Sequence, residues 1–106
     1  MKGLGLKLEG ILKRYKEIEH SLSHQENLDT SKLIDFNKEY SELGPLVESI
    51  NEYKKCENDI ENLKELLNDK DPSIKEIAET ELKEVNLKLK EYEIKLLKFL
   101  IPKDSN

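Results

Sequence analysis

Apolar side chains recur every three or four residues along nearly the whole of this 106-residue chain. That spacing places them on one face of an α-helix, because a helix has 3.6 residues per turn. Charged residues make up 39% of the chain and separate the apolar ones, a composition typical of amphipathic helices. The sequence therefore predicts an all-α fold, with three helices at about residues 4–25, 30–67 and 72–100.

Two polar stretches separate the three periodic blocks and indicate turns. In the first, SHQENLD, the side chains of Asp29, Thr30 and Ser31 can each cap a new helix. In the second, NDKDP, Asp71 is the expected N-cap and Pro72 the first helical residue, where a missing N–H has no consequence. Long helices joined by short turns pack antiparallel. We therefore expect an antiparallel three-helix bundle with long helices, a helical hairpin plus a shorter N-terminal helix. The residues expected to be buried include Leu12, Tyr15, Phe36, Tyr40, Leu43, Leu63, Leu82, Val85, Leu89 and Tyr92.

Gly44 and Pro45 interrupt the second block. Proline in a helix interior removes one backbone donor and clashes with the carbonyl four residues earlier, here that of Ser41. The apolar spacing nevertheless continues through the interruption in phase. This favours one long helix kinked at Gly44 and Pro45, with two separate helices as the alternative.

Charge and cysteine content limit the possible partners. A net charge of -5 does not suit a protein that grips nucleic acid, which calls for a surplus of Lys and Arg. The negative charge is concentrated in residues 26–70, which carry twelve acidic and six basic side chains. This pattern indicates a solvated helix face or, alternatively, a docking face for a basic protein. A single cysteine, Cys56, fits a reducing compartment, and no apolar run is long enough to span a membrane, so we expect a cytoplasmic protein without membrane contact.

Three short patterns imitate functional sites but lack essential members. His20 and His24 have the spacing of helical metal ligands, yet no Glu follows the first histidine, which favours two exposed histidines at a helix end. Asp69, Asp71 and Ser73 imitate the start of a calcium loop, but Ile74 and Thr80 replace its glycine and its bidentate glutamate. Cys56 has no histidine near it in sequence, so a half-buried thiol is favoured over a nucleophile. We therefore predict no catalytic, cofactor-binding or metal-binding residues, and no enzymatic activity.

The chain ends with its most apolar stretch, LLKFLIPKDSN. Leu96 and Leu100 continue the apolar face of the third helix, whereas Ile94, Leu97, Phe99 and Ile101 fall on its other faces. Such a helix end has more apolar surface than two neighbouring helices can cover. We expect a missing neighbour, or a homodimer formed through Leu97, Phe99 and Ile101.

Three segments, in order and spacing, resemble the N-terminal domain of bacterial class-I peptide chain release factors, of the type that reads UAA and UAG. They are KEYSELGPLVESINEYK at 38–54, LLNDKDPSIKEIAETEL at 66–82 and LLKFLIPKDSN at 96–106. The resemblance covers essentially the whole chain. Its most specific part is the leucine-rich helix end followed by Pro102, Lys103 and Asp104, which in this family leads into the central domain. Ser105 departs from the pattern, because the family often has a second proline there.

The resemblance implies a helical N-terminal domain at residues 1–101 and the start of a linker to a missing central domain at 102–106. It also implies a role in translation termination, as an arm that positions the factor on the ribosome near the stalk base of the large subunit. Stop-codon reading and the Gly-Gly-Gln loop belong to later domains of the family, and this chain contains no Gly-Gly-Gln. The alternative function is a stand-alone coiled-coil adaptor that binds a partner protein. Gly44-Pro45 and the two capped turns favour a folded-back bundle over an extended rod.

Overall fold

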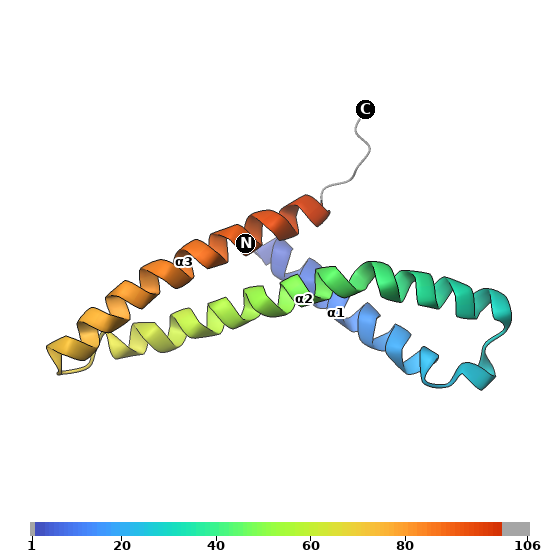
Figure 1. Ribbon diagram of the computed structural model, residues 1–106, viewed down its shortest axis with the longest axis horizontal. Coiled ribbons are helices and arrows are strands. Elements are labelled where there is room, and N and C mark those ends of the chain that lie inside the picture. The colour runs from blue at the N-terminus through green and yellow to red at the C-terminus, as the bar shows by residue number, and fades with distance from the viewer. Residues whose placement is uncertain (1, 101–106) are drawn as a thin grey trace, which may run out of the picture. The chain divides into compact units, whose positions relative to one another are not determined.

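The computed structural model describes residues 2–100, and within this range it is built of helices without any strand. Three α-helices, α1 (Lys2–Leu22), α2 (Thr30–Leu66) and α3 (Pro72–Leu100), follow one another in chain order (Figure 1). A short 3-10 helix, η1 (Gln25–Asn27), lies in the first connection. The predicted all-α fold is therefore confirmed. The boundary expected between residues 101 and 102 lies outside the described residues.

The two turns begin helices through the caps that the sequence predicts. Of the three candidates at the start of α2, Asp29 is the cap, because its Oδ1 accepts a hydrogen bond from the backbone N–H of Lys32 at 2.8 Å. Asp71 Oδ1 accepts the N–H of Ser73 at 2.9 Å, and Pro72 is the first residue of α3. Both caps satisfy backbone donors that the first helical turn leaves without a partner.

The predicted end of the first helix is wrong by three residues. α1 ends at Leu22, and the N–H of His24 donates to the carbonyl of Ser21 at 3.1 Å, which is the tighter three-residue pattern. The residues that follow are polar, so they have no apolar face whose burial would stabilise a longer α-helix. They form η1 instead of a last turn of α1.

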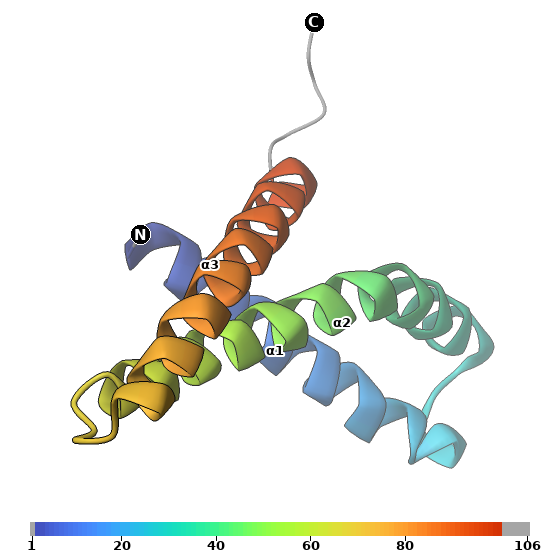
Figure 2. The same cartoon turned by 60° about the vertical axis from the view of Figure 1, so that its left-hand side comes forward.

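α2 is one continuous helix through Gly44 and Pro45, so the two-helix alternative is wrong. The chain nevertheless divides between Glu48 and Ser49 into two compact units. The first unit pairs α1 with the first half of α2, and the second pairs the second half of α2 with α3, antiparallel in each case (Figure 1). Figure 2 shows α3 running back along the second half of α2 from the turn at residues 67–71.

The buried face of α2 changes direction along the helix. In its first half the half-buried side chains include Phe36, Tyr40 and Leu43. In its second half the buried side chains include Cys56, Ile60 and Leu63. At 3.6 residues per turn, these two sets lie roughly half a turn apart around the helix. Each half of α2 therefore presents a different side to its own packing partner.

Most of the residues expected to form the core are only half-buried. Of the ten named from the sequence, Leu63 is fully buried, whereas nine are half-buried: Leu12, Tyr15, Phe36, Tyr40, Leu43, Leu82, Val85, Leu89 and Tyr92. The physical reason is that a pair of helices covers the line of contact between them and leaves the flanks of that line open. The largest fully buried side chains are instead Leu8, Ile18, Ile50 and Leu96.

Candidate functional site

A cluster of polar and aromatic side chains joins α1 to the first half of α2. Arg14 donates from Nε and Nη2 to the two carboxylate oxygens of Glu39, at 2.8 and 2.7 Å, and its guanidinium lies 5.8 Å from the ring centre of Phe36. At the next residue of each helix, the rings of Tyr15 and Tyr40 are stacked, with centres 4.6 Å apart and planes at 6°. The two hydrogen bonds between Arg14 and Glu39 fix the register of α1 and α2 more strictly than a single ion pair could.

The electrostatics of this cluster follow from its hydrogen bonds. The bond from Arg14 lowers the pKa of Glu39 below its ordinary value. The hydrogen bond with the Tyr15 hydroxyl raises the pKa of Tyr40 most. The next cause is the carboxylate of Glu19, whose Oε2 accepts a hydrogen bond from the Tyr40 hydroxyl at 2.9 Å. Both shifts reflect hydrogen bonds that stabilise the ionised carboxylate of Glu39 and the protonated hydroxyl of Tyr40. The cluster is a structural clasp, since each of its polar groups is engaged by another.

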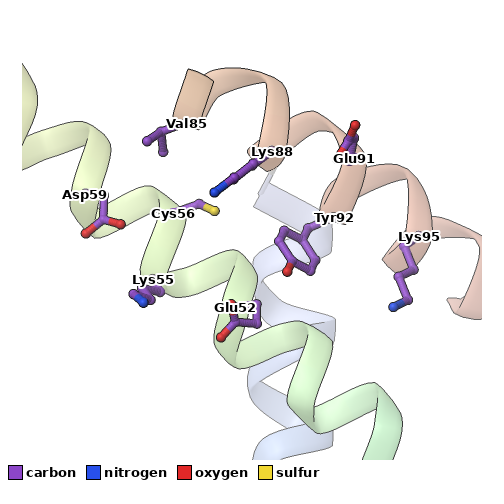
Figure 3. Close-up of a pocket in the computed structure, with 9 residues that line it drawn as sticks. All are labelled: Glu52, Lys55, Cys56, Asp59, Val85, Lys88, Glu91, Tyr92 and Lys95. Carbon is purple, nitrogen blue, oxygen red and sulfur yellow. The ribbon is translucent and has the colours of Figure 1, made fainter. Parts of the chain in front are cut away.

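A groove of about 390 Å³ runs between α2 and α3 in the second unit (Figure 3). Its nine lining residues are Glu52, Lys55, Cys56, Asp59, Val85, Lys88, Glu91, Tyr92 and Lys95. Three carboxylates and three ammonium groups therefore face the same furrow, and their charges cancel. A second hollow of about 370 Å³ shares Asp59, Val85 and Lys88 with it, so the furrow continues along the two helices. The second hollow adds Glu81 and Glu84, so the charges balance in the first groove but not along the whole furrow.

Cys56 lies in this groove and is buried. Burial, followed by the negative charges of Asp59 and Glu52, raises the pKa of its thiol. A thiol with a raised pKa carries little thiolate at neutral pH, and the thiolate is the nucleophilic form. Cys56 is thus a packing residue of α2, while its neighbour Glu57 is exposed.

The structure places the other sequence candidates in structural roles. His20 and His24 are exposed with ring centres 4.7 Å apart, and His24 Nδ1 lies 3.0 Å from the backbone carbonyl oxygen of His20. Asp69 Oδ1 accepts the N–H of Asp71 at 2.8 Å, so this carboxylate, like that of Asp71, is engaged by the turn itself. Across residues 2–100 no three His, Cys, Asp or Glu side chains are grouped to hold a metal ion.

The end of α3 carries exposed apolar side chains. Ile94 and Phe99 are 55% and 51% exposed, while Leu97 is half-buried and Ile101 lies outside the described residues. Sequence reasoning missed Leu87, which is 65% exposed. Its exposure could have been inferred from the sequence, because Leu87 lies seven residues before Ile94. This spacing places both side chains on a face of α3 away from the main apolar stripe. None of the helices in the described part of the chain is both long and apolar enough to cross a membrane.

Comparison with known proteins gives one consistent result. The family model described as the PCRF domain matches residues 11–106. The chain is also 36% identical, over 102 residues, to peptide chain release factor 1 of Wolbachia pipientis subsp. Culex pipiens (strain wPip). That match covers 93% of this chain and 28% of the relative, so the chain spans little more than a quarter of the relative's length. No solved structure gives a significant match.

Proposed function

This chain belongs to the PCRF domain family of peptide chain release factors, and on that premise we propose that it is the helical arm of a factor that terminates translation in the cytoplasm. The observation that carries the proposal is the family match over residues 11–106, nearly the whole chain. The arm contributes binding and position rather than chemistry. Among the described residues, Asp71 caps a helix, Arg14 pairs with Glu39, and the groove beside Cys56 is lined by equal numbers of carboxylates and ammonium groups. None of these arrangements is suited to activating a nucleophile.

The partner of the arm is the ribosome, at the stalk base of the large subunit. Support comes from the surface of α2, where Glu57, Glu61 and Glu65 are exposed and four residues apart on one side of the helix. A negative surface of this kind fits a basic ribosomal protein better than it fits RNA, because phosphates would repel it. Contact with protein at the ribosome is therefore the expected mode of binding.

Co-sedimentation tests this contact. The chain is pelleted with intact ribosomes and with ribosomes that lack the stalk-base proteins. We expect binding to the first and its loss on the second. Equal binding to both would show that the contact lies elsewhere on the ribosome. No binding to either, together with undiminished ribosome binding by a full-length factor that lacks this arm, would refute the positioning role.

Matched charge reversals locate the surface. Glu57, Glu61 and Glu65 are changed together to lysine, and the control changes three exposed glutamates of α3, Glu76, Glu79 and Glu84, in the same way. Both variants change the net charge equally, so a general electrostatic effect weakens both alike. Weaker binding by the α2 variant alone supports the proposed surface, and equal binding by both variants contradicts it.

A release assay separates position from chemistry. On ribosomes stopped at UAA, the isolated chain is expected to add no hydrolysis of peptidyl-tRNA over the level without a factor. A full-length factor without the arm retains hydrolysis at saturating concentration and loses it at limiting concentration, because binding rather than the chemical step is impaired. Release by the isolated chain would overturn the proposal.

A second copy of the chain is a further proposed partner. The support is the exposure of Ile94 and Phe99 at the end of α3, beside Leu97. Exposed apolar side chains that lie close together favour association, and pairing of one patch with itself about a two-fold axis is the simplest geometry.

A further inference from the structure

Gly44 and Pro45 form the weakest point of α2 by their backbone chemistry. Pro45 has no N–H to donate to the carbonyl of Ser41, so one rung of the helical hydrogen-bond ladder is missing inside a helix that runs from Thr30 to Leu66. Glycine directly before it allows more backbone conformations than any other residue. Sharp bends in long helices occur at such residues.

No steric requirement explains Gly44. Its φ is not in the left-handed region, and a Cβ added there would meet only the hydroxyl of Tyr15, at 3.9 Å, which is an ordinary contact. An alanine would therefore fit and would strengthen the helix. The remaining physical consequence of glycine at this position is a softer backbone.

The weak point lies where the packing of α2 changes. The division into two compact units falls between Glu48 and Ser49, one turn after Pro45. The first unit contains α1 and the first half of α2, and the second unit contains the second half of α2 and α3. Each half thus has its own partner. Ser41, Glu42 and Pro45 are exposed, and the helix becomes buried again directly after them, from Leu46 on.

We propose that Ser41 to Pro45 is a flexible joint within α2, at which the helix bends over a range of angles while each half keeps its own packed partner. Hinges of this kind consist of a few residues that absorb the change of backbone angles between otherwise rigid bodies. In an arm that must reach a distant contact, such a joint lets one unit adjust its direction without unfolding the other.

Distances between two spin labels on α2 test the joint. The labels are attached to cysteines at the exposed positions Asp35 and Glu61, on either side of it, in a Cys56→Ala background. A straight helix would place these positions about 39 Å apart. A pair at Glu76 and Lys98 on α3, about 33 Å apart, gives the reference for a helix with no glycine or proline between the labels. We expect a broader distribution for the α2 pair than for the α3 pair.

Substitutions test whether the breadth of the distance distribution between the α2 labels comes from the joint. Gly44→Ala and Pro45→Ala together are expected to narrow the α2 distribution to the width of the α3 pair, and Gly44→Ala alone to narrow it in part. Gly10→Ala is the matched control, because a Cβ there meets nothing within 4 Å and the same helix-strengthening change falls outside α2. Hydrogen exchange gives a second readout. Protection of the amides at residues 46–49 rises by roughly 100-fold in the double variant, as the difference in helix propensity between proline and alanine implies.

Each outcome decides the proposal. A wild-type α2 distribution as narrow as that of α3, whether centred at the straight-helix distance or at a shorter one, shows a rigid helix or a fixed kink and refutes the joint. A broad distribution that the double variant leaves unchanged places the flexibility elsewhere and refutes it as well. Should the double variant fold poorly by circular dichroism, Gly44→Ala alone decides, because alanine fits at that position without strain.

Discussion

The same truncation at three leucines of the second unit measures how far burial controls its stability. Leu63 is buried at 8% exposure, Leu89 is half-buried and Leu87 is 65% exposed. All three lie inside helices, so alanine changes the backbone propensity only slightly and equally at each. All three belong to the same compact unit, so their effects are read from one unfolding transition.

The expected costs follow from the exposures. Leu→Ala at a buried site costs about 2 to 5 kcal/mol, the transfer of the lost carbons plus a cavity. Leu63 lines a hollow open to solvent, which limits the cavity, so we expect about 2 to 3 kcal/mol there. Leu89 loses only part of its side-chain burial, which at 25 cal/mol per Å² gives about 1 to 2 kcal/mol. Leu87 is expected to stay within about 0.5 kcal/mol of the wild type.

Urea unfolding followed by circular dichroism provides the measurement. With a slope of about 1 to 3 kcal/mol per molar, Leu63→Ala shifts the midpoint to lower urea by about 1 to 2 M and Leu87→Ala hardly at all. The slope itself stays constant if the compactness of each state is unchanged. If Leu87→Ala costs as much as Leu63→Ala, or Leu89→Ala costs more than both, the assignment of the core to the α2–α3 contact is wrong.

Three further predictions concern titration, reactivity and association. Because Arg14 lowers the pKa of Glu39, this carboxylate stabilises the fold above its ordinary pKa, and the contribution is lost as pH falls through the lowered folded-state pKa. Glu39→Gln should therefore make the stability measured by urea unfolding depend less on pH in the acid range. An unchanged pH dependence there would contradict this prediction. Because burial raises the pKa of Cys56, a disulfide reagent should react slowly with this thiol in the native chain and at the rate of free cysteine in the urea-unfolded chain. Reaction of the native chain at the rate of free cysteine would contradict this prediction. Serine at Phe99 and Ile101 should lower dimerisation in sedimentation velocity with little change in helix content, whereas melting of the domain would place both side chains in its own core.

The elements of the fold could be read from local chemistry. The caps by Asp29 and Asp71 depend on a side-chain oxygen two or three residues before a helical N–H, and this is fixed by sequence alone. The start of α3 at Pro72 follows for the same reason. The end of α1 at Leu22 could not be read with the same accuracy, because His24 and its polar neighbours fit a last α-turn and a 3-10 turn about equally well.

The contacts of the candidate sites could be predicted only in part. The sequence indicated that Tyr15 and Tyr40 lie on apolar faces, but their stacking depends on the register between α1 and α2, which no local pattern encodes. The same holds for the ion pair of Arg14 with Glu39, whose partners are 25 residues apart. The groove beside Cys56 likewise requires the pairing of α2 with α3. Apolar spacing identified Tyr15 and Tyr40, whereas the partners in each of these contacts depend on tertiary packing.

The degree of burial was missed, although the sequence of α2 contained a signal for its cause. Between Val47 and Cys56 the buried positions advance by three residues three times in succession. Each step of three falls roughly 60° short of a full turn, so three uncompensated steps move the buried face to the other side of the helix. A stripe that served one continuous bundle would alternate steps of three and four. The run of steps of three, which begins at Val47, two residues after Pro45, therefore marks the point where α2 changes its packing partner. The division of the chain after Glu48 falls inside this run, and Gly44 and Pro45 lie about one turn before that division.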